Sequence, residues 1–310
     1  MKKKTLLIIG SSGFFGNSIV EFISKKNKFF QRINKIILIS RTQKNKFARK
    51  LKKNFQVKEL KVDMQKTKTL PHADYIIYSI ISKNFKKDHE SAKNYVKLAN
   101  KFHRGSNILF TSSGAVYGNQ PRSIKKFSEK HYPKPKNHKS LLRKNYAILK
   151  LKNENLFKQL ANNGSKVSIA RCFAFVGKNL PLNKNFVIGN FIKNIIEKKN
   201  ILIKSDKQIF RSYMHSEDLS YCLFKILFDN SDNKKIFNIG SDHRVDIRKV
   251  ALKLSKKFNL KVKMKILDKK KIDDIYIPNI NRFRKKYKYK KNLDSYKSII
   301  KTINQFNQNA

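Results

Sequence analysis

The sequence predicts an α/β protein built on a doubly wound parallel sheet, with a smaller lobe at the C-terminal end. Short runs rich in Ile, Leu, Val and Tyr alternate with helical patterns through the first half of the chain, and this alternation fades after Arg171. The runs are continuously apolar, as expected for strands that are covered on both faces. Alternation of strands and helices is typical of a parallel sheet with right-handed crossovers.

The expected strands of the sheet are short, apolar and rich in β-branched residues. In chain order they are Thr5–Ile9, Lys35–Ile39, Val57–Leu60, Tyr75–Tyr78, Asn107–Thr111 and Lys166–Ala170. Apolar residues at helical spacing between them predict the helices Phe14–Ser24, Lys86–His103 and Leu141–Asn162.

Beyond Arg171 we expect the helices Phe186–Lys199 and Ser216–Asn230, and a strand, Ile236–Ile239, that completes the sheet. The basic tail 259–292 could be a disordered arm, but its IDDIYIPNI segment and the helical rhythm of 293–306 favour a folded tail. The expected sheet domain is therefore 1–171 with about 215–240. The expected lobe is about 172–214 with 241–310.

The formal net charge of the 310 residues is +52, which raises the hypothesis of a nucleic-acid partner. The lysines are spread along the whole chain, however, and Asn, Ile, Phe and Tyr are abundant while Gly, Pro and Trp are scarce. AT-rich codons encode this mixture. We interpret most of the charge as genome bias on exposed faces, and nucleic acid is disfavoured as a partner.

The cysteines, the apolar runs and the histidines indicate the cellular compartment and exclude some kinds of site. The two cysteines, Cys172 and Cys222, cannot build a disulfide framework and fit a reducing, cytoplasmic setting. No apolar run approaches the roughly 20 residues that span a bilayer, so we expect no membrane span. The histidines show no metal-ligand spacing with Asp, Glu or Cys, so we expect no metal site.

A glycine-rich turn, GSSGFFG, directly follows the first strand and opens a helix. Gly10 permits the tight turn, Gly13 lets a pyrophosphate approach the backbone, and Gly16 lets the helix pack close to the strand. The N-terminus of a helix offers N–H groups and the positive end of its dipole to phosphate. These features predict dinucleotide binding on a Rossmann-type sheet, and the further contacts expected from this turn are Ser12, Phe14 and Phe15.

The end of the second strand bears on the choice of cofactor. No Asp or Glu stands there to bind a ribose 2′-hydroxyl; Ser40 and Arg41 stand there instead. Arg can pair with a 2′-phosphate, which favours NADP and leaves NAD possible. Because basic residues occur everywhere in this chain, Arg41 could also be a solvated surface residue. We place Asp63 and Met64 near the adenine, although Asp63 could instead cap its loop. Ser79 completes the expected cofactor contacts.

A serine, a tyrosine and a lysine form the candidate catalytic set. The fifth strand leads into TSSGAVYG, which contains Ser113, and Tyr146 and Lys150 lie downstream at a spacing that shares one helix face. A nearby ammonium would favour tyrosinate and lower the pKa of Tyr146 from about 10. The tyrosine could then exchange a proton with a sugar hydroxyl or ketone while hydride moves to or from a nicotinamide.

These motifs together resemble the extended short-chain dehydrogenases/reductases, and within them the NAD(P)-dependent sugar-nucleotide epimerase/dehydratase group. The matching segments are GSSGFFG, YIIYSI, TSSGAVYG, the Tyr146–Lys150 pair, RSYMHSEDL at 211–219 and FNIG at 237–240, so the resemblance covers nearly the whole chain. It implies that Ser113 is the catalytic serine and Ser112 its neighbour. It also implies that the smaller lobe binds a nucleotide-diphosphate sugar, with Arg211 at the diphosphate. The other implied substrate contacts are Ser113, Tyr117, Ala174 and Asn190.

Two departures from the family pattern affect the reaction. Dehydratases of this family carry Asp-Glu where this chain has Gly114 and Ala115, so 4,6-dehydration lacks its acid and base. Ala174 stands where the family often has a substrate-binding Asn. We therefore expect an NAD(P)-dependent epimerase or 4-ketoreductase, and the resemblance leaves a homodimer possible. The alternatives are a catalytically dormant relative that binds RNA through its basic surface, or a structural subunit that keeps the cofactor without turnover.

Overall fold

The computed structural model describes residues 3–42, 44–82, 84–182, 186–229, 231, 235–290 and 293–308. The chain divides into two compact units. The first comprises Met1–Gly118, Pro133–Cys172 and Ser220–Phe237, and the second comprises Asn119–Tyr132, Phe173–Leu219 and Asn238–Ala310. This division differs from the expected boundaries mainly at 119–132, which belongs to the second unit although sequence reasoning placed it with the sheet.

The sheet of the first unit has seven strands in the order β11-β6-β5-β4-β1-β2-β3. Their bounds are β1 Lys4–Ile9, β2 Ile33–Ser40, β3 Gln56–Lys61, β4 Tyr75–Tyr78, β5 Asn107–Ser113, β6 Lys166–Cys172 and β11 Lys235–Ile239. Neighbouring strands from β3 to β6 pair in parallel, as predicted. β5 and β6 each run two residues further than expected, because Ser112 pairs with Arg171 and Ser113 pairs with Cys172.

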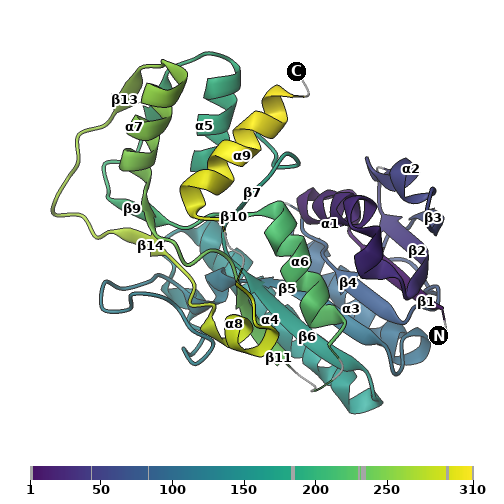
Figure 1. Cartoon of the computed structure of the whole chain (residues 1–310). Coiled ribbons are helices and arrows are strands. Elements are labelled where there is room, and N and C mark those ends of the chain that lie inside the picture. The colour runs from purple at the N-terminus through teal and green to yellow at the C-terminus, as the bar shows by residue number, and fades with distance from the viewer. Residues whose placement is uncertain are drawn as a thin grey trace. The chain divides into compact units, whose positions relative to one another are not determined.

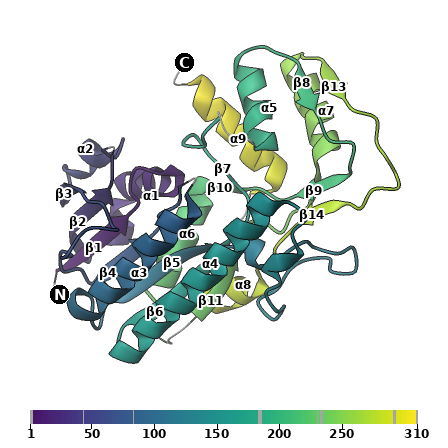
Figure 2. The same ribbon diagram turned by 180° about the vertical axis from the view of Figure 1, so that it is seen from behind.

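Helices cover both faces of this sheet. Figure 1 shows α1 (Phe14–Lys25) and α6 (Ser216–Leu227) in front of it, and Figure 2 shows α3 (Phe85–Phe102) and α4 (Leu141–Gln159) on the opposite face. The short helix α2, Ala48–Leu51, precedes β3. The fold is therefore the doubly wound arrangement predicted from the strand–helix alternation. Asn230, at the end of the helix predicted for α6, lies outside the described residues.

Local capping sets where the two long helices begin. The Asn84 side chain accepts a hydrogen bond from the Lys87 amide at 3.0 Å, and the Ser140 side chain accepts one from Arg143 at the start of α4. The helix predicted over 141–162 ends as an α-helix at Gln159 and continues as a 3₁₀ turn over Leu160–Asn163. Gly164, with φ of +81°, then ends this segment in a left-handed conformation.

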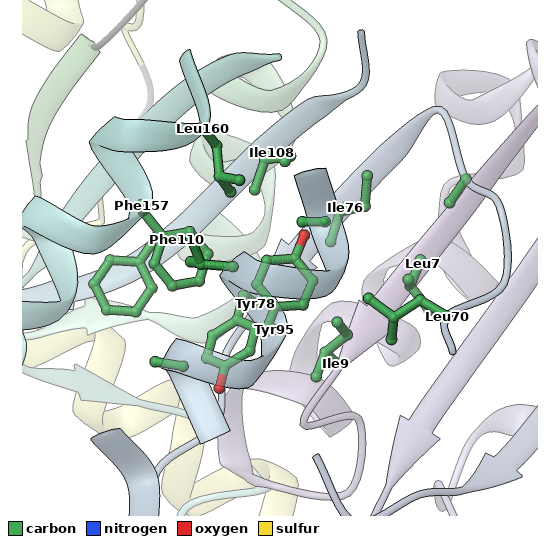
Figure 3. Close-up of a cluster of buried hydrophobic side chains, with 14 of the residues drawn as sticks. Leu7, Ile9, Leu70, Ile76, Tyr78, Tyr95, Ile108, Phe110, Phe157 and Leu160 are labelled. Carbon is green, nitrogen blue, oxygen red and sulfur yellow. The ribbon is translucent and has the colours of Figure 1, made fainter. Parts of the chain in front are cut away.

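A core of buried apolar side chains fills the space between the sheet and helices α3 and α4 (Figure 3). Phe110 of β5 and Phe157 of α4 are stacked with ring centroids 4.5 Å apart, and Tyr78 of β4 lies 5.0 Å from Phe157. Aromatic pairs at such distances add to the free energy of burial. This packing attaches α4, which carries Tyr146 and Lys150, to the strand that carries Ser113.

The second unit contains four helices among its described residues and small sheets of two or three short strands. The helices are α5 Val187–Ile196, α7 Ile247–Phe258, α8 Asn281–Tyr287 and α9 Ser295–Asn307. The strand groups are β12–β9–β14 (Val245–Asp246, Ile209–Arg211, Asp274–Tyr276), β13–β8 (Val262–Met264, Ile201–Ile203) and β10–β7 (Met214–His215, Phe175–Val176). The basic tail is folded over 259–290, as predicted, and 291–292 lie outside the described residues.

Helix α7 was not predicted, although the sequence carries a signal for it. Asp246 caps its first turn by accepting a hydrogen bond from the Arg248 amide at 2.8 Å. Its buried residues Ile247, Val250, Ala251 and Leu254 follow the three- and four-residue spacing of a helix face. None of the helices in the described part of the chain is long and apolar enough to cross a membrane.

Candidate active site

The glycine turn after β1 is compact for two separate reasons. Gly10 has φ of +87°, and a Cβ there would lie 2.9 Å from the carbonyl carbon of Ser79, so only glycine fits without strain. A Cβ on Gly16 would lie 2.4 Å from the carbonyl oxygen of Gly10. The first turn of α1 therefore packs directly onto the end of β1, and this packing requires glycine at position 16.

The start of α1 fits a phosphate group. Gly13 is the N-cap, none of the described side chains caps this end, and no acidic residue lies in its first turn. A Cβ on Gly13 would meet only the Gly10 carbonyl oxygen, at 3.5 Å, so the backbone on this side is open. Backbone N–H groups at the N-terminus of a twelve-residue helix attract an anion. Ser12, Phe14 and Phe15 lie partly exposed in the same turn.

Two asparagines that sequence reasoning missed brace this turn from the side. Asn17 donates to the carbonyl oxygen of Ser12 at 2.8 Å, and the buried Asn45 donates to the carbonyl oxygen of Ser11 at 2.6 Å. The Asn45 side chain also accepts from the Phe47 amide at 2.8 Å. These hydrogen bonds fasten the loop after β2 to the glycine turn. No motif in the sequence predicts a contact between residues that lie 34 positions apart.

The residues expected near the adenosine end of a dinucleotide have different environments. Ser40 is partly buried at the end of β2, and Arg41 is exposed. Asp63 accepts a hydrogen bond from the Gln65 amide at 3.0 Å, which is the loop-capping alternative. The Met64 side chain is 3% exposed and belongs to the core, so the structure gives it little surface for a ligand.

Ser79 joins the ends of two neighbouring strands. Its amide and its hydroxyl both donate to the carbonyl oxygen of Ile9, each at 2.9 Å. Ser79 is also the residue against which Gly10 packs. The structure thus shows this serine as a brace behind the glycine turn, with its hydroxyl already engaged.

Ser113, Tyr146 and Lys150 meet at the carboxyl end of β5. The Ser113 hydroxyl oxygen accepts a hydrogen bond from the Ala115 amide at 3.1 Å, which begins the 3₁₀ turn Gly114–Tyr117. The Lys150 ammonium nitrogen donates to the carbonyl oxygen of Thr111 at 2.9 Å. Tyr146 forms a side-chain hydrogen bond with Ser113. The Lys150 ammonium nitrogen also lies 5.9 Å from the centre of the Tyr146 ring, so the three side chains expected from sequence form one connected group.

The electrostatics of this group differ from the expectation. Burial raises the pKa of Tyr146 to about 12, although the hydrogen bond with Ser113 acts in the lowering direction. The predicted lowering by a nearby ammonium was therefore wrong for the protein by itself. Burial also lowers the pKa of Lys150 to about 8, against the opposing influence of Cys172, Asp88 and Glu154. Desolvation outweighs the Ser113 hydrogen bond at Tyr146, and it outweighs the attraction of Cys172, Asp88 and Glu154 at Lys150. The neutral phenol is therefore favoured, and the ammonium loses its proton more easily than an exposed one.

The residues expected to contact the substrate differ in how exposed they are and in their partners. Tyr117 is 2% exposed, and the Arg171 guanidinium lies 4.9 Å from its ring centre, so this ring is part of the core. Arg211 is paired with Asp274 of the adjacent strand, with 2.6 Å between Nη2 and Oδ2. Ala174 is partly buried, and Asn190 is exposed on α5. Asp274 as the partner of Arg211 was not foreseen, because the two lie far apart in sequence.

Within the described residues, no three His, Cys, Asp or Glu side chains gather as metal ligands would. Comparison with known families decides the class of the protein. Residues 6–240 match the model of the NAD dependent epimerase/dehydratase family. The chain belongs to this family. None of the curated proteins matches the chain in sequence.

Solved structures with the same fold include both epimerases and dehydratases. A dTDP-glucose 4,6-dehydratase from Bacillus anthracis, in complex with NAD, superimposes with a TM-score of 0.80 at 14% identity, over 99% of this chain and 97% of that one. A UDP-glucose 4-epimerase from Thermotoga maritima, with UDP-glucose, gives 0.78 at 15% identity, over 98% and 99%. A UDP-N-acetylglucosamine 4-epimerase from Methanobrevibacter ruminantium, in complex with UDP-N-acetylmuramic acid, gives 0.78 at 17% identity, over all of both chains.

Proposed function

We propose that this member of the epimerase/dehydratase family is an NAD(P)-dependent epimerase or 4-ketoreductase that acts on a nucleotide-diphosphate sugar. The observation that carries the proposal is the connected group of Ser113, Tyr146 and Lys150 at the end of β5. β5 is separated only by β4 from β1, whose end leads into the glycine turn. The similar structures from Thermotoga maritima and Methanobrevibacter ruminantium are epimerases with UDP-sugars bound, which supports this substrate class.

In this proposal each of the three side chains has its own role. Tyr146 gives a proton to a sugar oxygen or takes one from it, and the Ser113 hydroxyl holds that same oxygen. Lys150, fixed by the Thr111 carbonyl, places positive charge beside this exchange. A bound nicotinamide would supply the hydride acceptor or donor and, when oxidised, a positive charge that favours tyrosinate. That charge matters because Tyr146 by itself has a pKa of about 12.

Elimination of water is disfavoured by the turn that follows Ser113. Gly114 and Ala115 occupy the first two positions of the 3₁₀ turn, where dehydratases of this family carry Asp and Glu. Neither residue can give or take a proton through its side chain. Oxidation at a sugar hydroxyl followed by return of the hydride, or simple reduction of a ketone, requires no further acid–base pair.

NADP is the favoured cofactor in this proposal, with NAD as the alternative. Ser40 and the exposed Arg41 end β2 without a carboxylate, and the Arg41 guanidinium could pair with a 2′-phosphate. Similar structures were solved with NAD, including the Bacillus anthracis dehydratase. Competition between the two cofactors in binding measurements decides between them.

Turnover of a panel of UDP-, GDP-, CDP- and dTDP-sugars tests the function. We expect the wild type to act on at least one, and Tyr146→Phe to slow hydride transfer about 10²- to 10⁴-fold, followed by nicotinamide absorbance in single turnovers. Tyr132→Phe is the matched control, since Tyr132 is 80% exposed. A wild-type rate of hydride transfer in Tyr146→Phe would refute the catalytic role of Tyr146. Salt-dependent RNA binding without any turnover would instead favour the dormant alternative.

A further inference from the structure

Behind the catalytic group lies a second group of polar side chains that the proposed chemistry does not use. It consists of Ser112, Tyr117, Glu154 and Arg171, which we call the Glu154 clamp. Ser112 and Arg171 face each other in the register of β5 and β6. Glu154 lies one helical turn after Lys150 on α4, and Ser112 directly precedes Ser113. Ser112 and Glu154 are therefore direct neighbours of the catalytic group along the strand and the helix, and Arg171 is the strand partner of Ser112.

The clamp consists of short hydrogen bonds between buried side chains. The Arg171 guanidinium donates from Nε to Glu154 Oε1 at 2.9 Å and from Nη2 to Oε2 at 2.7 Å. The Ser112 hydroxyl donates to the same Oε1 at 2.6 Å. The Glu154 side chain is 0% exposed and that of Arg171 is 4% exposed. One carboxylate thus ties α4 to both β5 and β6, and the Arg171 guanidinium also lies over the ring of Tyr117 in the turn after Ser113.

A gain in stability does not explain such a pair, because apolar residues of similar volume often serve a core equally well. What apolar packing supplies less well is a fixed position along the strand. The contacts of Phe157 with Phe110 hold α4 to the sheet through ring faces, which tolerate small displacements. A two-pronged guanidinium–carboxylate contact is more restrictive in its geometry. The clamp therefore sets where α4 lies along β5.

We propose that Glu154 is a positioning residue, which acts through Arg171 and Ser112 to hold Tyr146 and Lys150 at the end of β5. The proposal rests on the proposed function, since it concerns the same site. All four members of the clamp are buried, with exposed fractions between 0% and 3%.

The charge of Glu154 also affects the pKa of Lys150. The groups around the Lys150 ammonium are Tyr146 and Glu154 on α4, Cys172 on β6, Asp88 on α3 and the Thr111 carbonyl on β5. Burial lowers the pKa of Lys150 to about 8, and Cys172, Asp88 and Glu154 oppose that lowering. Without the Glu154 charge, the pKa of Lys150 should fall further, and the ammonium should be lost at a lower pH.

Glu154→Gln tests both consequences, because it keeps the side-chain shape and removes the charge. We expect kcat to fall about 10- to 100-fold with KM changed less, as for a small misplacement of catalytic groups. The alkaline limb of the kcat–pH profile should also move to lower pH. Ser112→Ala retains the ion pair, so kcat should fall only a few-fold with the limb unmoved. Glu90→Gln, at a half-exposed carboxylate paired with Lys93 on α3, should match the wild type.

A second measurement works without any substrate. Spectra of protein labelled at tyrosine Cζ with ¹³C contain one Tyr146 resonance, identified by its loss in Tyr146→Phe. We expect that resonance to move in Glu154→Gln and, by less, in Ser112→Ala, which also serves if Glu154→Gln does not fold. A wild type that turns over no sugar nucleotide would refute the proposed function and leave this readout intact. An unmoved Tyr146 resonance, or a reduced kcat with an unmoved alkaline limb in Glu154→Gln, overturns the positioning role.

Discussion

Gly16→Ala places the smallest possible side chain where the glycine turn has no room. The new Cβ would lie 2.4 Å from the Gly10 carbonyl oxygen, and equally close to the carbonyl carbon and oxygen of Ser11. All three are backbone atoms, so no flexible side chain can move aside. Overpacking costs typically about 1–3 kcal/mol, and this site belongs in the upper part of that range. Alanine returns about 1 kcal/mol through its higher helix propensity. We expect a net loss of about 1–2 kcal/mol in unfolding free energy.

Gly189→Ala is the matched control for this prediction. Gly189 also lies in the first turn of a helix, α5, but its nearest neighbour would be 3.6 Å from an added Cβ, which is ordinary van der Waals contact. The same exchange of glycine for alanine should therefore stabilise the protein by up to about 1 kcal/mol. Urea unfolding of both variants measures the opposite signs directly.

The clash at Gly16 should also weaken dinucleotide binding. Relief of the contact at Gly16 requires α1 to move away from β1, and this movement displaces the N–H groups offered to a phosphate. Dinucleotide affinity, measured by fluorescence titration with NADPH, should fall about tenfold, equivalent to about 1.4 kcal/mol. Gly189→Ala should bind as the wild type does. A Gly16→Ala protein with wild-type stability and wild-type affinity would refute the close-packing argument.

Three further predictions concern single side chains. Arg41→Ala should weaken NADPH binding more than tenfold while leaving NADH binding nearly unchanged, since about 1.5–3 kcal/mol of charge-assisted bonding is lost; equal losses in titrations would make Arg41 a surface residue. The pKa of Lys150 is about 8 in the folded chain and 10.5 by ordinary value, so the unfolded chain binds more protons between those pH values. Wild-type stability relative to Lys150→Met should therefore rise by about 3 kcal/mol from pH 8 to pH 10.5, and a constant difference in urea midpoints would contradict this. Tyr146→Phe and Lys150→Met should be strongly non-additive in single-turnover rates, because both serve one proton exchange; simple additivity would separate their roles.

Much of the first unit could be predicted because its signals are contiguous in sequence. A buried parallel strand needs four or more apolar residues in a row, and a phosphate turn needs its glycines at fixed spacing. β1, the turn to Gly16 and α1 therefore appear as one readable segment. The grouping of Ser113, Tyr146 and Lys150 could also be predicted, since the end of a strand and one face of a helix are both local patterns. Helix α7 was also predictable, because its Asp246 cap and the spacing of its buried residues are present in the sequence.

The sequence by itself determined the chain order of the main strands and helices of the first unit, the position of the glycine turn and the candidate catalytic residues. Only the tertiary structure decided the partners that set their properties. Asn45 reaches Ser11 across 34 residues, Arg211 pairs with Asp274 across 63, and Glu154 joins Ser112 and Arg171 from a different element. The pKa of Tyr146 was misjudged for the same reason. Desolvation sums over every atom packed around a group, and those atoms come from parts of the chain that only folding brings together.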